Sequence, residues 1–317
     1  MPERVLLADI GGTNARFALL DGARLGPTAS VPVKDYPRFD QAVSAFLSRT
    51  GARIPVSRAV LAVAGAVEKN HASITNSSWV IDASELQSAF NLERVLIIND
   101  FEAIAWSLPH LAATDLFPIG GGERAAQAPA VVLGPGTGLG LACFLPRADE
   151  SIVISTEGGH VTLPCMSRRE DDVIAHLRDR FGHVSAERAV SGPGLANLYE
   201  ALGALSGVAV PVRGGIEVTD AALNGSCRFS REALDMFCAM LGTVAGNAAL
   251  TFGARGGVYI GGGIAPRIID YLARSQFRTR LETKGRFRSY VAAISSSVIV
   301  HPEPAFIGLR GLARAGF

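Results

Sequence analysis

This chain of 317 residues has little charge imbalance, few cysteines and very few lysines. Its 30 basic and 29 acidic side chains leave a formal net charge of +1, which is too small to attract nucleic acid or an anionic membrane. The four cysteines lie far apart and form no CxxC pair, so neither a disulfide framework nor a zinc knuckle is expected. We expect a cytoplasmic protein with reduced thiols that binds neither nucleic acid nor membrane.

The lysines also exclude one common phosphate-binding motif. The chain has only Lys34, Lys69 and Lys284, and none of them closes a GxxxxGK[ST] turn, so a P-loop is excluded.

The first residues contain no apolar core long enough for a signal peptide. The nineteen residues between Asp235 and Arg255 carry no charge, which approaches a membrane span in length. Glycine, threonine and asparagine dilute this stretch, which predicts a buried helix instead.

Glycine is the residue in excess. It accounts for 35 of 317 positions, or roughly 11% against about 7% in average proteins, and this predicts many tight turns or backbone that approaches a ligand closely. Hydrophobic residues make up 48% of the chain, which is ample for buried cores. The length favours two domains, with a boundary near residues 108–116, where Pro109 and Pro118 interrupt the chain.

Hydrophobic periodicity predicts two α/β halves. In the first half we expect strands at 4–10, 15–20, 29–34, 59–67 and 95–98, with helices after 38 and after Asp82. In the second half we expect strands at 130–133, 139–145, 151–155, 257–260 and 298–301, and helices near 171–180, 194–202 and 230–252. A shift of 124 residues aligns Gly12-Thr13 with Gly136-Thr137. This indicates an internal duplication, although two Gly-Thr hairpins can also match by chance.

The first glycine-rich turn follows a buried strand that ends in an acid. It contains Gly11, Gly12, Thr13 and Asn14, and Asp9 precedes it. Glycines leave backbone N–H groups open to a phosphate, and a carboxylate can hold hydrated Mg²⁺. The alternative is an ordinary hairpin turn. We favour phosphate binding, because a plain hairpin does not need such a polar turn.

The second glycine-rich turn contains Gly136, Thr137 and Gly138. Its glycines resemble a dinucleotide-binding fingerprint, but that motif requires a helix after the turn. The residues that follow, 141–145, have the composition of a strand. A second strand-turn-strand phosphate clamp is therefore the better interpretation. A third cluster, with Gly262 and Gly263 after the strand 257–260, suits adenine or its ribose, or is simply a crowded turn.

Two polar clusters follow strand ends. Asn99 and Asp100 come at the carboxyl end of a buried strand, where α/β sheets place ligands. Asp100 is a candidate general base and Asn99 a candidate for binding a neighbouring hydroxyl, whereas the structural alternative is an Asp N-cap for the helix 101–107. Glu157 and His160 are separated by two glycines, which lets both point at one polyhydroxylated ligand. Glu187 alone reads as a solvated charge.

Together these segments resemble the bacterial glucokinase family, in the superfamily of sugar kinases, actin and Hsp70-like ATPases. LADIGGTNARFAL, LGPGTGLG and GGVYIGGGIAPR are similar to the two phosphate motifs and the adenosine motif, and IINDFEAIA and TEGGH to the sugar-site motifs. TNSSW, with Asn76, matches a substrate-side motif without an assigned contact. The order of the motifs covers essentially the whole chain. One departure matters: only Cys165 follows His160 closely, whereas the related repressor, open-reading-frame and kinase group carries a cysteine-rich zinc motif there.

The resemblance implies a two-domain actin-like ATPase (ribonuclease H-like) fold, with a mixed sheet flanked by helices in each domain and an active site in the interdomain cleft. Residues 1–110 would form the smaller domain, to which 302–317 return, and 111–301 the larger one. The implied activity is ATP-dependent glucose phosphorylation, the first step of glycolysis, in a zinc-free homodimer. Asp100 would be the base, Asn99, Glu157, His160 and Glu187 would bind the sugar, and Mg²⁺ would arrive with ATP. Another sugar kinase, an ATP-dependent switch and a sugar-sensing regulator remain alternatives.

Overall fold

The computed structural model describes residues 4–50, 55–74 and 77–317. Contacts divide the chain into two compact units, Met1–Ala112 with His301–Phe317 and Ala113–Val300. We call these unit 1 and unit 2 and describe each by itself. The segment with Thr75 and Asn76 lies outside the described residues, so the expected substrate-side motif there has no structural account.

Unit 1 is built on a six-stranded sheet with the strand order β3-β2-β1-β5-β9, in which β4 also pairs with β2. β1 and β2 are antiparallel, whereas β1, β5 and β9 run parallel. A small sheet, β6-β7-β8, lies in the same unit. The strands are β1 Arg4–Ile10, β2 Asn14–Asp21, β3 Arg24–Leu25, β4 Ala29–Pro32, β5 Val56–Val63, β6 Val67–Glu68, β7 His71–Ser73, β8 Val80–Asp82 and β9 Arg94–Asn99.

The helices of unit 1 are α1 Phe39–Arg49, α2 Ala83–Phe90, α3 Asp100–Ser107 and α11 Pro304–Ala315. Alternate residues of β1, such as Leu6 and Ala8, share a core with the apolar faces of α1 and α2. α3 and α11 pack on each other, and α11 also packs on β1 and β5 and α3 on β5 and β9. Their approach depends on Gly308, where a Cβ would overlap with the carbonyl oxygen of Ala103.

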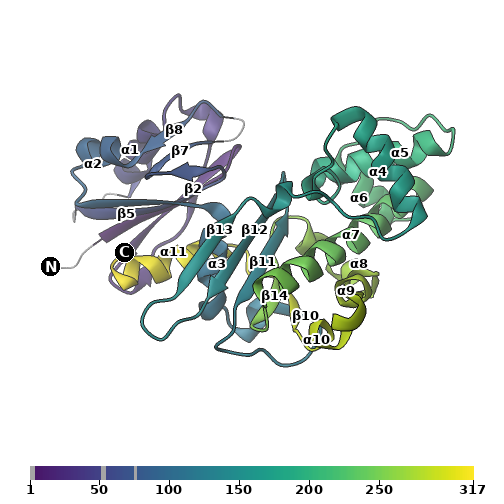
Figure 1. Cartoon of the computed structure of the whole chain (residues 1–317). Coiled ribbons are helices and arrows are strands. Elements are labelled where there is room, and N and C mark those ends of the chain that lie inside the picture. Colours follow the sequence, from purple (N-terminus) through teal and green to yellow (C-terminus); the bar gives the residue numbers. More distant parts are fainter. Residues whose placement is uncertain (1–3, 51–54, 75–76) are drawn as a thin grey trace. The chain divides into compact units, whose positions relative to one another are not determined.

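Unit 2 repeats the strand arrangement of unit 1. Its six-stranded sheet has the order β10-β15-β14-β11-β12-β13, so that β11, β12 and β13 lie side by side (Figure 1). In unit 2, β11-β12 and β12-β13 are antiparallel, as β1-β2 and β2-β3 are in unit 1. β11, β14 and β15 run parallel, as β1, β5 and β9 do in unit 1. The shared topology supports an internal duplication over a chance match of two turns. The strands are β10 Leu116–Gly120, β11 Ala130–Pro135, β12 Leu139–Leu145, β13 Ile152–Thr156, β14 Gly257–Ile260 and β15 Ser296–Ile299.

The helices of unit 2 surround a long central helix, α7. They are α4 Arg168–Phe181, α5 Gly192–Leu205, α6 Gly215–Leu223, α7 Arg228–Phe252, α8 Ile269–Arg274, α9 Phe277–Glu282 and α10 Arg288–Ala292. α7 has a mean hydropathy of 1.4 over its most apolar window, and 83% of that window is buried inside the fold. The uncharged stretch is therefore a core helix, as expected, and it packs against α5, α6 and α9.

A buried ion pair joins three of these helices. Arg280 of α9 donates to both carboxylate oxygens of Glu170 in α4, at 2.6 and 3.0 Å. The Nε of Arg280 also donates to Thr243 Oγ1 of α7 at 3.1 Å. Glu170 and Arg280 are 3% and 9% exposed, so each needs the other to compensate its lost hydration.

The expected elements differ from the structure mainly at their ends. The run 59–67 is interrupted after Val63, and beyond this point the carbonyl of Gly65 accepts from Asn99 Nδ2. The strand expected at 29–34 ends at Pro32, where a 3₁₀ turn, Val33–Asp35, begins. Sequence periodicity missed the short elements, whose length gives little periodic signal, and also the longer helices α6 and α11. The short elements that it missed are β3, β6, β7, β8, β10 and α8 to α10.

Candidate active site

The turn between β1 and β2 is the first predicted phosphate site. Gly11 N–H donates to the carbonyl of Asn14 at 3.0 Å, and Val33 N–H donates to the carbonyl of Thr13 at 2.9 Å, so Gly12 lies between two anchored residues. The backbone shape of the turn is thus fixed by the hairpin and by its neighbour β4. This fits a preformed loop that presents N–H groups to an anion.

Asp9 lies across the β1-β2 hairpin from Arg16. The two are direct partners in the register, and Arg16 Nη1 lies 3.4 Å from Asp9 Oδ2. Burial raises the pKa of Asp9, Arg16 opposes this rise, and the nearby charge of Glu303 adds to it. Arg16 and Glu303 were not predicted. The hairpin register could have found Arg16, whereas nothing in the sequence relates Asp9 to a residue almost 300 positions away.

The parallel pairing of β1, β5 and β9 brings the predicted acids to one edge of the sheet. Ile10, Val63 and Asn99 are aligned in register at the carboxyl ends of these strands. Asp9 and Asp100 therefore lie close enough for the charge on Asp9 to raise the pKa of Asp100. The sequence predicted this strand-end position for Asn99 and Asp100, and ligand binding there stays a prediction.

The helix after β9 is capped by a different residue than the structural alternative for Asp100 assumed. The N-cap of α3 is Asn99, whose Oδ1 accepts from Phe101 N–H at 2.9 Å and Glu102 N–H at 3.3 Å. Asn99 Nδ2 donates to the carbonyl of Gly65 at 3.1 Å. The capping role thus belongs to Asn99, and an Asp N-cap is wrong, because Asp100 is already the first residue of the helix.

Asp100 has the ionisation of a general base suited to neutral pH. Burial is the largest cause and the charge of Asp9 the second, and together they raise the pKa of Asp100 from 3.8 to about 7. A hydrogen bond from Phe101 N–H to Asp100 Oδ1, at 3.0 Å, opposes this rise. A base works best when its pKa lies near the working pH.

The turn between β11 and β12 is the second predicted phosphate site. Gly136 N–H donates to the carbonyl of Gly138 at 2.8 Å, and Gly192 N–H, at the start of α5, donates to the carbonyl of Gly136 at 2.8 Å. A Cβ built on Gly136 would meet nothing within 4 Å. This side of the turn, next to Thr137, therefore has room for a ligand.

Of the predicted sugar residues, Glu157 precedes a short 3₁₀ turn, Gly158–His160, and His160 is its last residue. Their side chains are 70% and 60% exposed and face each other, with His160 Nε2 3.8 Å from Glu157 Oε2. A Cβ on Gly159 would overlap with the carbonyl oxygen of Leu139. The glycine pair thus lets the segment pack on the second phosphate turn while both polar side chains stay accessible.

Glu187 also lies at the second phosphate turn, although its sequence context indicated a solvated charge. Its Oε2 accepts from Leu139 N–H at 2.9 Å. Ala186 N–H donates to the carbonyl of Val161 at 2.9 Å, which joins this segment to the one that carries His160. Unit 2 therefore brings Glu187 and the Glu157-His160 pair to the same turn.

The third glycine cluster packs against the same part of unit 2. Gly262 has a φ of +76°, and a Cβ there would lie 2.5 Å from the carbonyl oxygen of Pro135. Gly261 N–H donates to the carbonyl of Leu133 at 2.7 Å. A Cβ on Gly263 would meet nothing within 4 Å. The predicted adenosine motif is thus adjacent to the predicted phosphate turn, and their ligand roles stay predictions.

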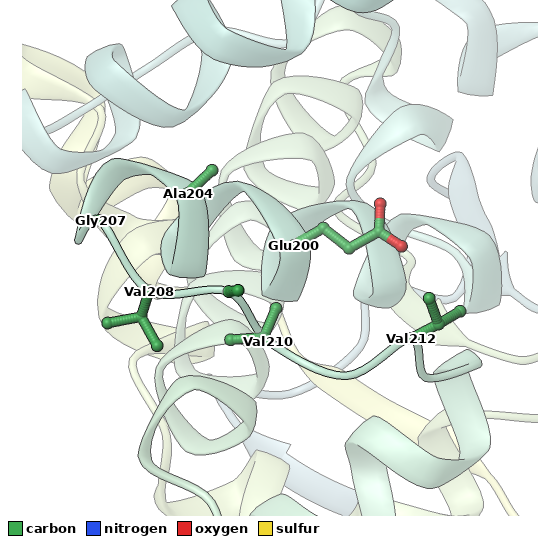
Figure 2. A pocket seen from close by; sticks show the side chains of 7 residues that line it. Glu200, Ala204, Gly207, Val208, Val210 and Val212 are labelled. Atoms are coloured by element: carbon green, nitrogen blue, oxygen red, sulfur yellow. The ribbon is translucent and has the colours of Figure 1, made fainter.

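A pocket elsewhere in unit 2 has a different chemistry. It has a volume of about 400 Å³ and lies at the end of α5 (Figure 2). Its lining is aliphatic apart from one carboxylate, and it consists of Glu200, Ala204, Gly207, Val208, Ala209, Val210 and Val212. None of the predicted site residues lines this pocket, and it offers no cluster of donors for a phosphate or a sugar.

Solved structures with the same architecture define the class of protein. The chain has a TM-score of 0.88 and 35% identity to a glucokinase from an Antarctic psychrotroph, covering 98% of this chain and 99% of that one. It has a TM-score of 0.66 and 19% identity to a ROK family glucokinase from Streptomyces griseus in complex with glucose and AMPPNP, covering 99% and 100%. The fold is that of the actin-like ATPase sugar kinases, as the motifs implied.

The sequence comparisons narrow this class further. A family model described as Glucokinase matches residues 6–315. A glucokinase from Paramagnetospirillum magneticum is 45% identical over 315 residues, which covers 98% of both chains. The chain therefore belongs to the Glucokinase family. The prediction of a glucose-phosphorylating enzyme is confirmed.

Proposed function

We propose that this chain transfers the γ-phosphoryl group of ATP to the 6-hydroxyl of glucose, giving glucose 6-phosphate and ADP, with Asp100 as the general base. The observation that carries the assignment of the base is a partly buried carboxyl with a pKa of about 7 at the carboxyl end of β9. A carboxyl whose pKa lies near the working pH can both accept and release a proton there, as a general base must.

We assign the remaining contacts by the motifs and by the contacts within each unit. Both glycine turns present backbone N–H groups to the phosphates of ATP, and the third glycine cluster lies against its adenosine. The sugar hydroxyls bind polar side chains at the strand ends. The phosphate and adenosine residues are Gly11, Gly12, Thr13, Asn14, Gly136, Thr137, Gly138, Gly262 and Gly263, and the sugar residues are Asn99, Asp100, Glu157, His160 and Glu187.

Asp9 fits a role beside the Mg²⁺ that accompanies ATP. Burial is the main cause that raises its pKa, Arg16 at 3.4 Å opposes the rise and Glu303 adds to it, so a further cation would stabilise the ionised carboxylates of Asp9 and Asp100. Bound Mg²⁺ neutralises charge on the phosphoryl oxygens. Carboxylate and water oxygens are the ligands that this ion prefers.

The protein supplies three things to the transfer. Sugar contacts orient the 6-hydroxyl, and the backbone N–H groups of the turns hold the phosphates in line with it. As the hydroxyl oxygen bonds to the γ-phosphorus and the bond to the ADP oxygen breaks, the hydroxyl proton passes to the carboxylate of Asp100. Its Oδ2 is suited to this step, since Oδ1 already accepts from Phe101 N–H.

Asp100→Asn tests the assignment of the base. The variant should lose about 10²- to 10⁴-fold in kcat, which is the usual contribution of general base catalysis. Glucose affinity, measured calorimetrically, should change little, because the asparagine keeps an oxygen at the Oδ1 position. Equal losses of glucose binding and turnover would instead make Asp100 a structural residue.

Glu102→Gln is the matched control. Glu102 lies in the same first turn of α3, and burial raises its pKa as well, so a general loss of negative charge there should affect both variants alike. We expect near-normal turnover in this control.

ADP release that does not depend on glucose in the unmodified protein would favour the ATP-dependent switch or the sugar sensor over the kinase.

Three finer points are part of the same proposal. ATP should be the donor, which a comparison of ATP, ADP and polyphosphate checks, and glucose should be preferred in a hexose panel. We also propose a homodimer in the cytoplasm. The homodimer rests on the family resemblance. Sedimentation analysis of the full chain tests it, and a monomer at micromolar concentration would contradict it.

A further inference from the structure

The carboxylate of Glu187 is packed directly against the second phosphate turn. Its Oε2 accepts from Leu139 N–H at 2.9 Å. A Cβ on Gly138 would lie 2.5 Å from this oxygen and 3.3 Å from Cδ, and apart from its chain neighbours it would meet no other described residue within 4 Å. Gly138 has no positive φ that would require glycine. Glycine at position 138 therefore leaves room for the Glu187 carboxylate, and it is not required by the backbone conformation.

Both ends of this turn are held by one segment of unit 2. Leu139 is bound by Glu187, and the carbonyl of Gly136 accepts from Gly192 N–H at 2.8 Å. Ser191 joins these two anchors, because its hydroxyl donates to the carbonyl of Glu187 at 2.7 Å and accepts from the N–H of Gly194 at 2.9 Å. A displacement of Glu187 would consequently alter the support of the whole turn.

One oxygen of Glu187 remains available for a ligand. Within residues 4–50, 55–74 and 77–317, the hydrogen bond from Leu139 is made to Oε2, and no donor is recorded for Oε1. The side chain is only partly buried. A carboxylate accepts hydrogen bonds at both oxygens at once, so Glu187 can hold the turn and a sugar hydroxyl together.

We propose that Glu187 is a positioning residue that couples hexose binding to the conformation of the Gly136–Gly138 turn. The inference rests on the proposed function, in which Glu187 binds a sugar hydroxyl. A hydroxyl on Oε1 restricts the side-chain rotamer and thereby strengthens the hold of Oε2 on Leu139 N–H. By linkage, hexose and nucleotide then raise each other's affinity by the same factor.

Calorimetric titration of the full chain with the ATP analogue AMPPNP and Mg²⁺, with and without glucose, measures this coupling. Glucose should raise the affinity for AMPPNP by about 5- to 150-fold, the usual range for coupled sites. In Glu187→Ala, AMPPNP should bind more weakly even without glucose, and the effect of glucose should fall below about twofold. Glu187→Gln keeps an oxygen for Leu139 N–H, so it should restore most of the affinity for AMPPNP alone.

Glu157→Ala is the comparison that separates coupling from sugar binding. Glu157 is exposed and has no contact with Leu139 N–H. This variant should weaken glucose binding and leave the affinity for AMPPNP alone unchanged. If Glu187→Ala behaves in the same way as Glu157→Ala, Glu187 is only a sugar ligand: the coupling is refuted and the proposed function stands.

Gly138→Ala tests the same contact from the other side. Its methyl group should displace the Glu187 carboxylate and weaken glucose binding, although residue 138 binds no sugar in the proposal. In the Glu187→Ala background the same substitution should have little further effect on glucose, because its only neighbour has been removed. Equal effects of Gly138→Ala in both backgrounds would overturn the coupling. Unchanged glucose affinity in Glu157→Ala and Glu187→Ala alike would instead overturn the proposed sugar site.

Discussion

Asp100→Asn should stabilise unit 1 at the pH where the unmodified enzyme works. Burial and the charge of Asp9 raise the pKa of Asp100 from 3.8 to about 7. Such a carboxyl binds its proton more tightly in the folded state, so its penalty is absent below the unfolded pKa and grows as the pH rises toward 7. Asparagine has no charge to lose and keeps an Oδ1 for Phe101 N–H.

The size of this effect follows from the pKa values. At about 1.4 kcal/mol for each pKa unit, a rise from 3.8 to about 7 corresponds to about 4 kcal/mol as an upper limit. Because Asp100 is only partly buried, water screens part of the penalty, and we expect a gain of about 1–3 kcal/mol at pH 8. For a unit of this size that corresponds to an increase in Tm of roughly 3–10 °C.

Tryptophan fluorescence measures this change selectively, since both tryptophans of the chain, Trp79 and Trp106, lie in unit 1. Thermal unfolding of the variant and the unmodified chain should differ little near pH 4 and increasingly up to pH 8. Glu102→Gln again serves as the control for a general change of charge on α3. A Tm difference that is the same at every pH, or a less stable variant at pH 8, would refute the burial argument for Asp100.

Three further outcomes are expected. The acidic limb of kcat/KM should lie near pH 7, and Asp9→Asn should move it to lower pH, because the charge that raises the pKa of the catalytic carboxyl is lost. Arg280→Met should destabilise unit 2 by about 3–5 kcal/mol in urea unfolding followed by circular dichroism, and adding Glu170→Met should recover much of this loss. Gly308→Ala should lower stability by about 1–3 kcal/mol, and Gly311→Ala by less, because its Cβ would meet only the movable ring of His110 at 2.8 Å.

The elements that the sequence predicted well are those with a strong local signal. β1, β12 and β14 have the predicted bounds, because a glycine-rich turn follows the apolar run in β1 and β14 and precedes it in β12. Asp100 could also be expected at a strand end, since it directly follows a buried strand, whereas its proximity to Asp9 depends on β5, which pairs in parallel with both β1 and β9. Local pattern, strand direction and turn chemistry were sufficient for these residues.

Other features depend on contacts between distant segments and could not be read locally. Glu187 follows no strand end and precedes a turn, so its sequence neighbours resemble a solvated loop. Its position against Leu139 arises because backbone hydrogen bonds join Val161 to Ala186 and Gly136 to Gly192. The N-cap of α3 was misread for a simpler reason: both Asn99 and Asp100 are good capping residues, and only the helix start decides between them.

The glycine excess has a physical explanation in unit 2. At Gly159 and Gly262 a Cβ would collide with backbone on or beside the second phosphate turn, and at Gly138 it would collide with a carboxylate. These glycines therefore do not serve mainly to make loops flexible. They let segments from distant parts of the chain approach one turn more closely than side chains would allow. A turn supported on several sides in this way keeps its N–H groups oriented before a phosphate arrives, which is the preorganisation that phosphoryl transfer requires.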